Sequence, residues 1–251
     1  MKRLIIFLAA FGVLAGFTGI TGQSLLFSDS ETAGVQSVAR FPGSHNPVWN
    51  LRATKPLIIG GYGDNFNYDG SRVRELKGEA IAELNTEKNT GKMEVVLNGT
   101  INPEKGKFYT GEIQIVYRIA SEGPPFWEGG VADFVLLHGN TKQGPPVMPK
   151  VRAFVAAWGE ADVYVDGKLI YEGLDGHMMY TERTRDVATR AIYSRDSSGF
   201  YSPKDPANFS IADPNGREIH FVVHSNNMDK GNFPPHNVWI HLNFEEVREV
   251  I

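Results

Sequence analysis

Apolar and polar residues alternate in short runs through most of the chain. The clearest run is FYTGEIQIVYRIA, in which Ile113, Ile115, Tyr117 and Ile119 occupy every second position. Because successive side chains of a strand point to opposite faces, this spacing predicts a strand with one apolar face. Comparable runs, separated by turn residues, cover residues 56–62, 73–84, 92–101, 131–139, 151–159 and 161–173. The chain is therefore expected to consist of antiparallel strands.

The turns between these runs favour the same fold. Asp166-Gly167 is a preferred pair for a tight hairpin turn. Pro-Pro pairs cannot lie inside a sheet, so they mark stiff loops at residues 124–125, 145–146 and 234–235. Only residues 180–192 have a composition that allows a helix. We expect an all-β protein, an antiparallel β-sandwich or jelly roll with long Pro/Gly loops and at most one short helix.

The N-terminal part of the chain divides into an export signal and a spacer. Two cations precede an apolar run from Leu4 to Ile20, which is typical of a signal peptide or of a retained anchor. We expect a signal peptide at residues 1–22, a polar linker or wrapping arm at 23–54, and one β-sandwich domain at 55–251. Two smaller β domains that meet within residues 121–130 are the alternative. The mature protein is then secreted or held at the cell surface, and it meets a membrane only through its N-terminal segment.

Composition excludes several classes of function. The chain has no cysteine, which rules out disulfides, thiolate metal sites and cysteine nucleophiles. A formal net charge of −4, without any run of lysine or arginine, offers no basic surface to nucleic acid. The Gly-x-Ser-x-Gly elbow, the phosphate-binding loops and His-Glu-x-x-His are also missing from the sequence. A metal ion would have to be bound by histidine, carboxylate or methionine.

The segment after the export signal, LLFSDSETAG at Leu25 to Gly34, resembles another group of exported proteins. A short apolar signal followed by Phe-Ser-Asp-x-Glu-Thr is similar to the start of the TasA and camelysin group of surface and biofilm-fibre proteins. That resemblance covers these ten residues and implies a jelly-roll-like body. It also implies a structural role, in which the segment from Ser28 to Thr54 adds as a strand to a neighbouring sheet edge and builds a homo-oligomer or fibre.

Histidines concentrate in two predicted strands near the C-terminus. In the first, His220 and His224 share the face opposite the apolar residues, at a Cα separation of about 13 Å that is too long for one ion. If this strand pairs antiparallel with residues 238–244, a register with Val222 opposite His241 turns both apolar faces into one core. His241 then lies diagonally from both other histidines, about 7 Å away at Cα. Trp239 falls opposite His224.

Two further histidines could complete a site on this face. His236 follows the Pro-Pro loop, and His177 stands in the Gly-His-Met-Met sequence elsewhere in the chain. The imidazoles could simply face solvent or hydrogen-bond within the fold. Alternatively they bind a metal, for which imidazole and thioether donors without thiols favour copper first and zinc second. Trp239 could also stack on an organic ligand such as a sugar.

Three hypotheses of function follow from these features. The leading one is an exported β-sandwich binding protein, whose partner is a metal ion or small ligand at the His-rich strand pair. The second is the surface or fibre subunit described above. The third is a metal-dependent enzyme on a jelly-roll scaffold, in which His177, His224 and His236 converge with Glu182 or Asp229 on one metal. The sequence leaves open whether the protein is an enzyme.

Overall fold

The structure, a computed structural model, describes residues 39–62, 68–120, 130–144, 148–194, 199–200, 213–227 and 235–250. Contacts divide the chain into two units, Met1–Gln36 and Ser37–Ile251, and every described residue belongs to the second. The expected signal peptide and the TasA-like segment lie outside the described residues and stay predictions.

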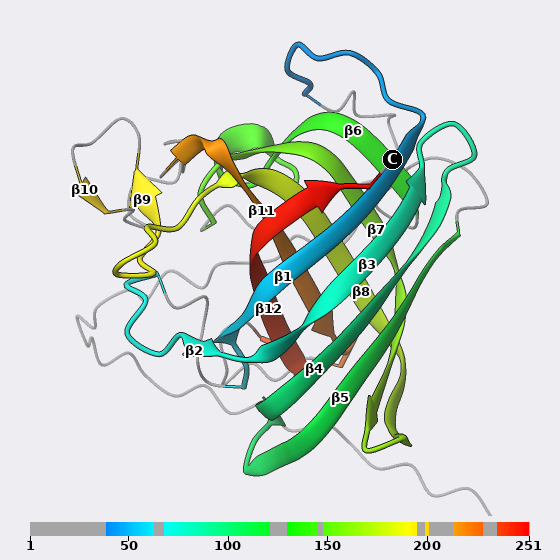
Figure 1. Cartoon of the computed structure of the whole chain (residues 1–251), viewed down its shortest axis with the longest axis vertical. Helices are drawn as coiled ribbons and strands as arrows, with labels where there is room; N and C mark the ends of the chain where they lie inside the picture. The colour runs from blue at the N-terminus through cyan, green and yellow to red at the C-terminus, as the bar shows by residue number, and fades with distance from the viewer. Residues whose placement is uncertain are drawn as a thin grey trace, which may run out of the picture. The chain divides into compact units, whose positions relative to one another are not determined.

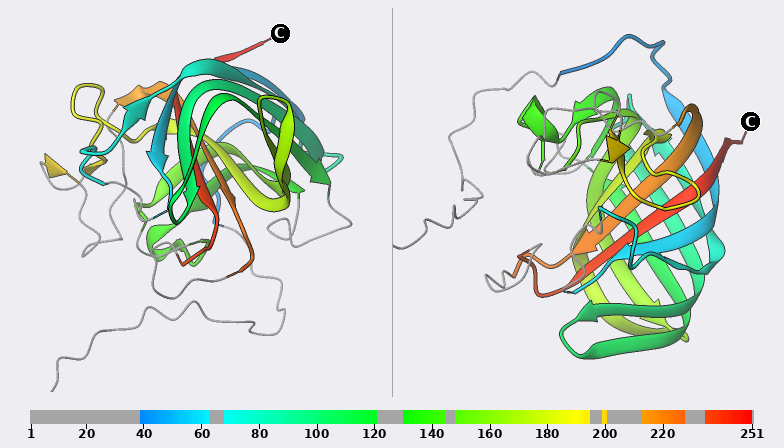
Figure 2. Two further views of the ribbon diagram at one scale, coloured as in Figure 1. Left: turned by 90° about the horizontal axis from the view of Figure 1, so that it is seen from below. Right: turned by 90° about the vertical axis from the view of Figure 1, so that its left-hand side faces the viewer.

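Antiparallel strands of the second unit follow one another around a closed barrel in chain order (Figure 1). Each strand pairs with the next one of the set, and the last pairs with the first, which closes the sheet. The barrel strands are β1 (Val48–Gly60), β3 (Lys77–Asn85), β4 (Thr90–Glu104), β5 (Lys107–Ala120), β7 (Val151–Val165), β8 (Lys168–Arg183), β11 (Asp213–His224) and β12 (Trp239–Glu249). They tilt as they wrap around the barrel, as closure of a sheet requires (Figure 2).

Shorter elements lie outside this ring. The strand β6 (Gly130–Leu137) pairs with β7, and β2 (Arg74–Glu75) pairs with β1. A separate pair is formed by β9 (Tyr193–Ser194) and β10 (Gly199–Phe200). The segment at Ala39–Phe41 adds to β6 within the same chain, through backbone hydrogen bonds from Leu136 to Ala39 and from Phe41 to Phe134. The only helix among the described residues is the 3-10 turn Gly139–Thr141.

The prediction of an all-β antiparallel fold is confirmed, but the plain sandwich or jelly roll is wrong. The sheet closes on itself because β1 pairs along most of its length with β12. This strand starts at Val48, inside the range expected to be a polar linker, and its Trp49, Leu51 and Ala53 are buried. A helix does not form in residues 180–192, where β8 ends and Asp186 instead accepts hydrogen bonds from the backbone of a turn.

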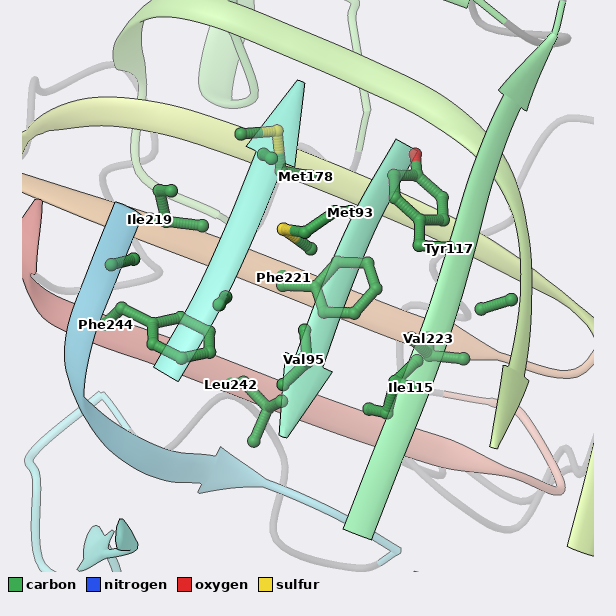
Figure 3. Close-up of a cluster of buried hydrophobic side chains, with 14 of the residues drawn as sticks. Met93, Val95, Ile115, Tyr117, Met178, Ile219, Phe221, Val223, Leu242 and Phe244 are labelled. Atoms are coloured by element: carbon green, nitrogen blue, oxygen red, sulfur yellow. The ribbon is translucent and has the colours of Figure 1, made fainter. Parts of the chain in front are cut away.

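Large apolar side chains fill the inside of the barrel (Figure 3). Tyr117, Phe221 and Phe244 are fully buried there, among aliphatic residues from the other strands. The Tyr117 hydroxyl donates a 3.1 Å hydrogen bond to the backbone carbonyl of Gly176, so this buried polar atom is satisfied. Any Cβ at Gly176 would approach the Tyr117 ring to 2.4 Å. The interior is thus a packed core, and the strands that build it have only their outer faces left for other chemistry.

Two neighbouring residues of β4 test this orientation of side chains. Leu97 is fully buried and Val96 is 38% exposed. We expect Leu97→Ala to lower the free energy of unfolding by about 2–5 kcal/mol, because it leaves a cavity in the core. Val96→Ala should cost less than about 1 kcal/mol. Urea denaturation of both variants measures the difference, and equal losses would show that the faces of β4 are assigned wrongly.

Candidate functional site on the outer wall

Cross-strand pairing arranges the outer faces of β7, β8, β11 and β12 into rows of directly opposed residues. Glu160, Asp175, His224 and Trp239 form the first row. The second row consists of Trp158, His177, Val222 and His241, and the third of Ala156, Met179, His220 and Asn243. The predicted register, with Val222 opposite His241 and Trp239 opposite His224, is confirmed.

Other segments cover much of this wall, which is unusual for the polar face of a sheet. Met148 and Tyr68 pack over Val222 and Trp239. His220, His241 and Asn243 are buried as well, although they lie outside the barrel. Buried polar groups require hydrogen-bond partners or pairing with a charge. The exposure rises along the first row, where His224 and Asp175 are half-buried and Glu160 is exposed.

The most buried part of the wall is organised around Glu218. Its Oε1 accepts hydrogen bonds from the backbone N–H of Thr184 at 2.7 Å and the Thr184 hydroxyl at 2.5 Å, and it lies 2.7 Å from His220 Nε2. Burial alone would raise the pKa of Glu218, but the charge and hydrogen bond of His220 and the bonds from Thr184 outweigh it and lower that pKa. Glu218 is therefore a buried carboxylate. Arg185, which is also buried, provides an opposite charge nearby.

Beside this network lies a cavity of about 10 Å³, room for roughly one water molecule. His138, His220 and His241 line it together with Met148, Met179 and Arg185. Burial lowers the pKa of His138 to about 3 and that of His241 well below its ordinary value. Arg185 adds to the lowering at His241, since a cation disfavours a second positive charge. The imidazoles of His138 and His241 are consequently neutral at pH 7.

His138 has a backbone conformation that side chains rarely adopt. Its φ of 62° and ψ of −172° belong to a region populated essentially by glycine. The residue follows β6, and its carbonyl accepts hydrogen bonds from the hydroxyl and the backbone N–H of Thr141. Its Nε2 lies 3.3 Å from the sulfur of Met179, and Nδ1 has no hydrogen-bond partner among the described residues. Strain of about 1–3 kcal/mol persists only where surrounding structure imposes it, often at functional sites.

A second, shallower group contains His224, His236 and Trp239. Both imidazoles point Nδ1 at the same acceptor, the backbone carbonyl of Ser225, at 3.2 Å from His224 and 2.8 Å from His236. Their ring centroids are 4.1 Å apart, and the Trp239 ring lies nearly parallel to each of them at 18°. Burial lowers the pKa of His224, and it lowers that of His236 to about 4 with a contribution from His224.

The structure therefore divides the predicted site residues into a deep group, a shallow group and one separate histidine. His220 and His241 lie deep, with ring centroids 5.7 Å apart, whereas His224 and His236 form the shallow pair. His177 stacks on Trp158 at 4.4 Å and donates toward the carbonyl of Ala157. Within the described part of the chain, no three His, Asp or Glu side chains are close enough to hold one metal ion.

The two acids proposed for a metalloenzyme do not join these histidines in the described structure. Glu182 pairs with Arg152 at 3.6 Å, and it lies on the opposite face of β8 from His177. Asp229 is outside the described residues. Sequence analysis did not identify five residues that the structure places on the wall or beside it: Glu160, Asp175, Glu218, His138 and Arg185. Alternation along β7 and β8 could have indicated that Glu160 and Asp175 face outward.

Comparison of the chain with protein families, with curated proteins and with solved structures found no match. Among the residues that the structure describes, no helix is sufficiently long and apolar to cross a membrane.

Acid should destabilise the metal-free protein, because the fold keeps several imidazoles neutral. His138, His177 and His236 have folded pKa values of about 3, 4 and 4, against an ordinary value of 6.5. Below pH 6.5 the unfolded chain binds protons that the folded chain does not, so stability falls as the pH drops from about 6.5 toward 4. Each such histidine contributes up to about 1.4 kcal/mol per pH unit. Urea denaturation with a chelator present, at pH 7 and pH 5, measures this loss.

His177→Gln should reduce the difference between the two pH values, since one of the titrating groups is removed. The lowered pKa of Glu218 also makes stability fall with decreasing pH, but only below the ordinary glutamate pKa of 4.5. That range lies outside the interval from pH 7 to pH 5. Stability that is constant or higher at pH 5 would contradict the neutral state of these imidazoles.

The Glu218 network can be tested separately. Glu218→Gln retains the shape of the side chain but removes the charge opposite Arg185, so we expect a loss of about 3 kcal/mol or more in the free energy of unfolding. Glu94→Gln, at an exposed position of β4, should change stability by less than about 0.5 kcal/mol. If the two substitutions cost the same at pH 7, the buried carboxylate has no stabilising role.

Proposed function

We propose that this chain is an exported metal-binding protein whose centre is the shallow pair His224 and His236. The observation that carries the proposal is the shared hydrogen bond of both imidazoles to the Ser225 carbonyl. A carbonyl oxygen can only accept, so each Nδ1 must carry the proton and each Nε2 must present a lone pair. Histidines that bind metals are almost always oriented in this way, by donating the other ring N–H to a carbonyl or carboxylate.

The protonation state of the pair agrees with this role. A metal displaces a proton from an imidazolium, so neutral imidazoles bind without that cost. Burial lowers the pKa of both histidines, and His236 reaches about 4, so the pair is neutral at pH 7. The rings also lie in contact, 4.1 Å between centroids, which lets two donors approach one ion.

Negative charge at the same end of the wall favours a cation. Asp175 stands directly opposite His224 on β8, and Glu160 stands directly opposite Asp175 on β7. Like charges in opposed positions destabilise a sheet. A divalent ion beside His224 and His236 would offset this repulsion, with Asp175 as the carboxylate donor after a change of side-chain rotamer. Two imidazoles and a carboxylate without thiols suit zinc or copper.

The expected location outside the cell comes from the N-terminal sequence alone. An apolar run behind two cations indicates export, and absence of cysteine means that no thiol competes for the ion. The proposal requires binding but no catalysis.

Calorimetric titration with Zn(II) and Cu(II) at pH 7.5 tests the proposal. We expect one equivalent of ion to bind, and replacement of both His224 and His236 by Asn to weaken binding at least tenfold, because loss of second-shell partners alone already costs about 10–100-fold. Asp175→Asn should weaken it as well. His45→Asn is the matched control, because His45 pairs with Asp133 and takes no part in the wall. A flat trace with both ions, or unchanged binding by the double variant, would sink the proposal.

A further inference from the structure

The deep cavity brings together two soft donors that the proposed centre does not use. His138 Nε2 and the Met179 sulfur are 3.3 Å apart, although they are 41 residues apart in the chain. When one ion binds two donor atoms at about 2 Å each with a near-tetrahedral angle between the bonds, the donor atoms lie roughly 3.3 Å apart. Both side chains line the cavity, next to His241 and the thioether of Met148.

Neither simple hydrogen bonding nor packing accounts for His138 fully. A proton on Nε2 would make an N–H to sulfur contact, but Nδ1 would remain a buried acceptor without a partner among the described residues. If an ion binds Nε2 instead, Nδ1 carries the proton and needs an acceptor, which a buried water molecule beside it would supply. The glycine-type backbone of His138 adds a strain cost, which persists only where the surrounding structure imposes it.

Charge distinguishes this cavity from the shallow centre. Arg185 lines the cavity and is buried, and the buried Glu218 nearby balances its charge. The surroundings are therefore close to neutral, whereas the shallow row has Asp175 and Glu160. A dication beside the Arg185 guanidinium would be repelled strongly at low dielectric. A monovalent ion that prefers neutral nitrogen and sulfur ligands would meet half of that repulsion.

We propose that His138 Nε2 and Met179 Sδ bind monovalent copper in the deep cavity, as a second site distinct from the His224 and His236 centre. Thioether and imidazole donors select Cu(I) among biological metals, and this ion accepts low coordination numbers. His241 or Met148 can supply a third donor from the cavity wall. The volume of about 10 Å³ admits a single small ion and no organic ligand.

Anaerobic titration of the full chain with Cu(I), against a chromophoric Cu(I) chelator, tests this site. We expect one tightly bound equivalent that Met179→Leu weakens at least tenfold, since leucine preserves volume but removes the sulfur. Met93→Leu is the matched control, because Met93 is equally buried but lies in the barrel core. X-ray absorption of the loaded protein should show sulfur in the first shell. No bound Cu(I), or equal affinity in Met179→Leu and the wild type, would overturn the proposal.

Two further variants separate this site from the shallow centre and from misfolding. The His224→Asn and His236→Asn double variant should retain Cu(I) binding, and its loss there would place the ion at the shallow pair instead. Circular dichroism verifies the fold of Met179→Leu. Should that variant not fold, His138→Gly provides the same test, because glycine adopts the backbone conformation of position 138 without strain. Retention of full affinity in His138→Gly would also overturn the proposal.

Discussion

The pairing of β12 with two partners is the constraint on which the rest of the structure depends. One edge of β12 bonds to β11 and the other to β1, so the sheet has no open edge around the barrel. Because side chains alternate along a strand, one register then decides both faces together. Phe221 and Leu242 enter the core only in the register that places Val222 and His241 on the outer wall. A slip by one residue would put imidazoles in the core and expose phenylalanine.

Burial of the outer wall changes what its histidines can do. In water an imidazole titrates near neutrality, but under the covering segments the charged form loses its hydration, and the pKa values of His138, His177 and His241 fall. Charged side chains lie at both the exposed end and the buried end of the wall. Asp175 and Glu160 stand in the half-buried to exposed row, and Arg185 with Glu218 lies at the buried end. The wall therefore offers neutral nitrogen donors in two electrostatic environments.

The sequence predicted the local geometry well and the closure poorly. The register of β11 with β12 could be predicted because three apolar residues of β11, at positions 219, 221 and 223, and four within residues 238–244 must all face the same core. The second half of β1 falls within the strand predicted at residues 56–62, but its first half was assigned to the polar linker. Apolar and polar residues alternate there too, yet the run is short and Ala53 contributes little to a hydrophobic pattern. Closure itself joins residues from the two ends of the unit, and no local pattern encodes which distant edges will meet.

The grouping of the histidines was out of reach for a related reason. Strand spacing indicated that His241 lies diagonally between His220 and His224, but it could not show that His236 would turn toward His224 and share the Ser225 carbonyl. His138 reaches the wall from the end of β6, by a backbone conformation that its residue type disfavours. Nor did the sequence show that β8 is the other neighbour of β11, which brings Asp175 opposite His224 and Met179 opposite His220.

The packed interior of the barrel limits where a ligand can bind. With Tyr117, Phe221 and Phe244 filling the space between the strands, a ligand could enter only by displacing core side chains, at a cost of several kcal/mol for each one. Chemistry is then confined to the outer faces, where a residue can be polar without weakening the core. The strands β7, β8, β11 and β12 use this freedom, because their outward positions hold histidine, tryptophan and acid while their inward positions remain apolar. Segments that cover these positions convert a surface into a partly dehydrated site, which is the condition under which neutral imidazoles persist at pH 7.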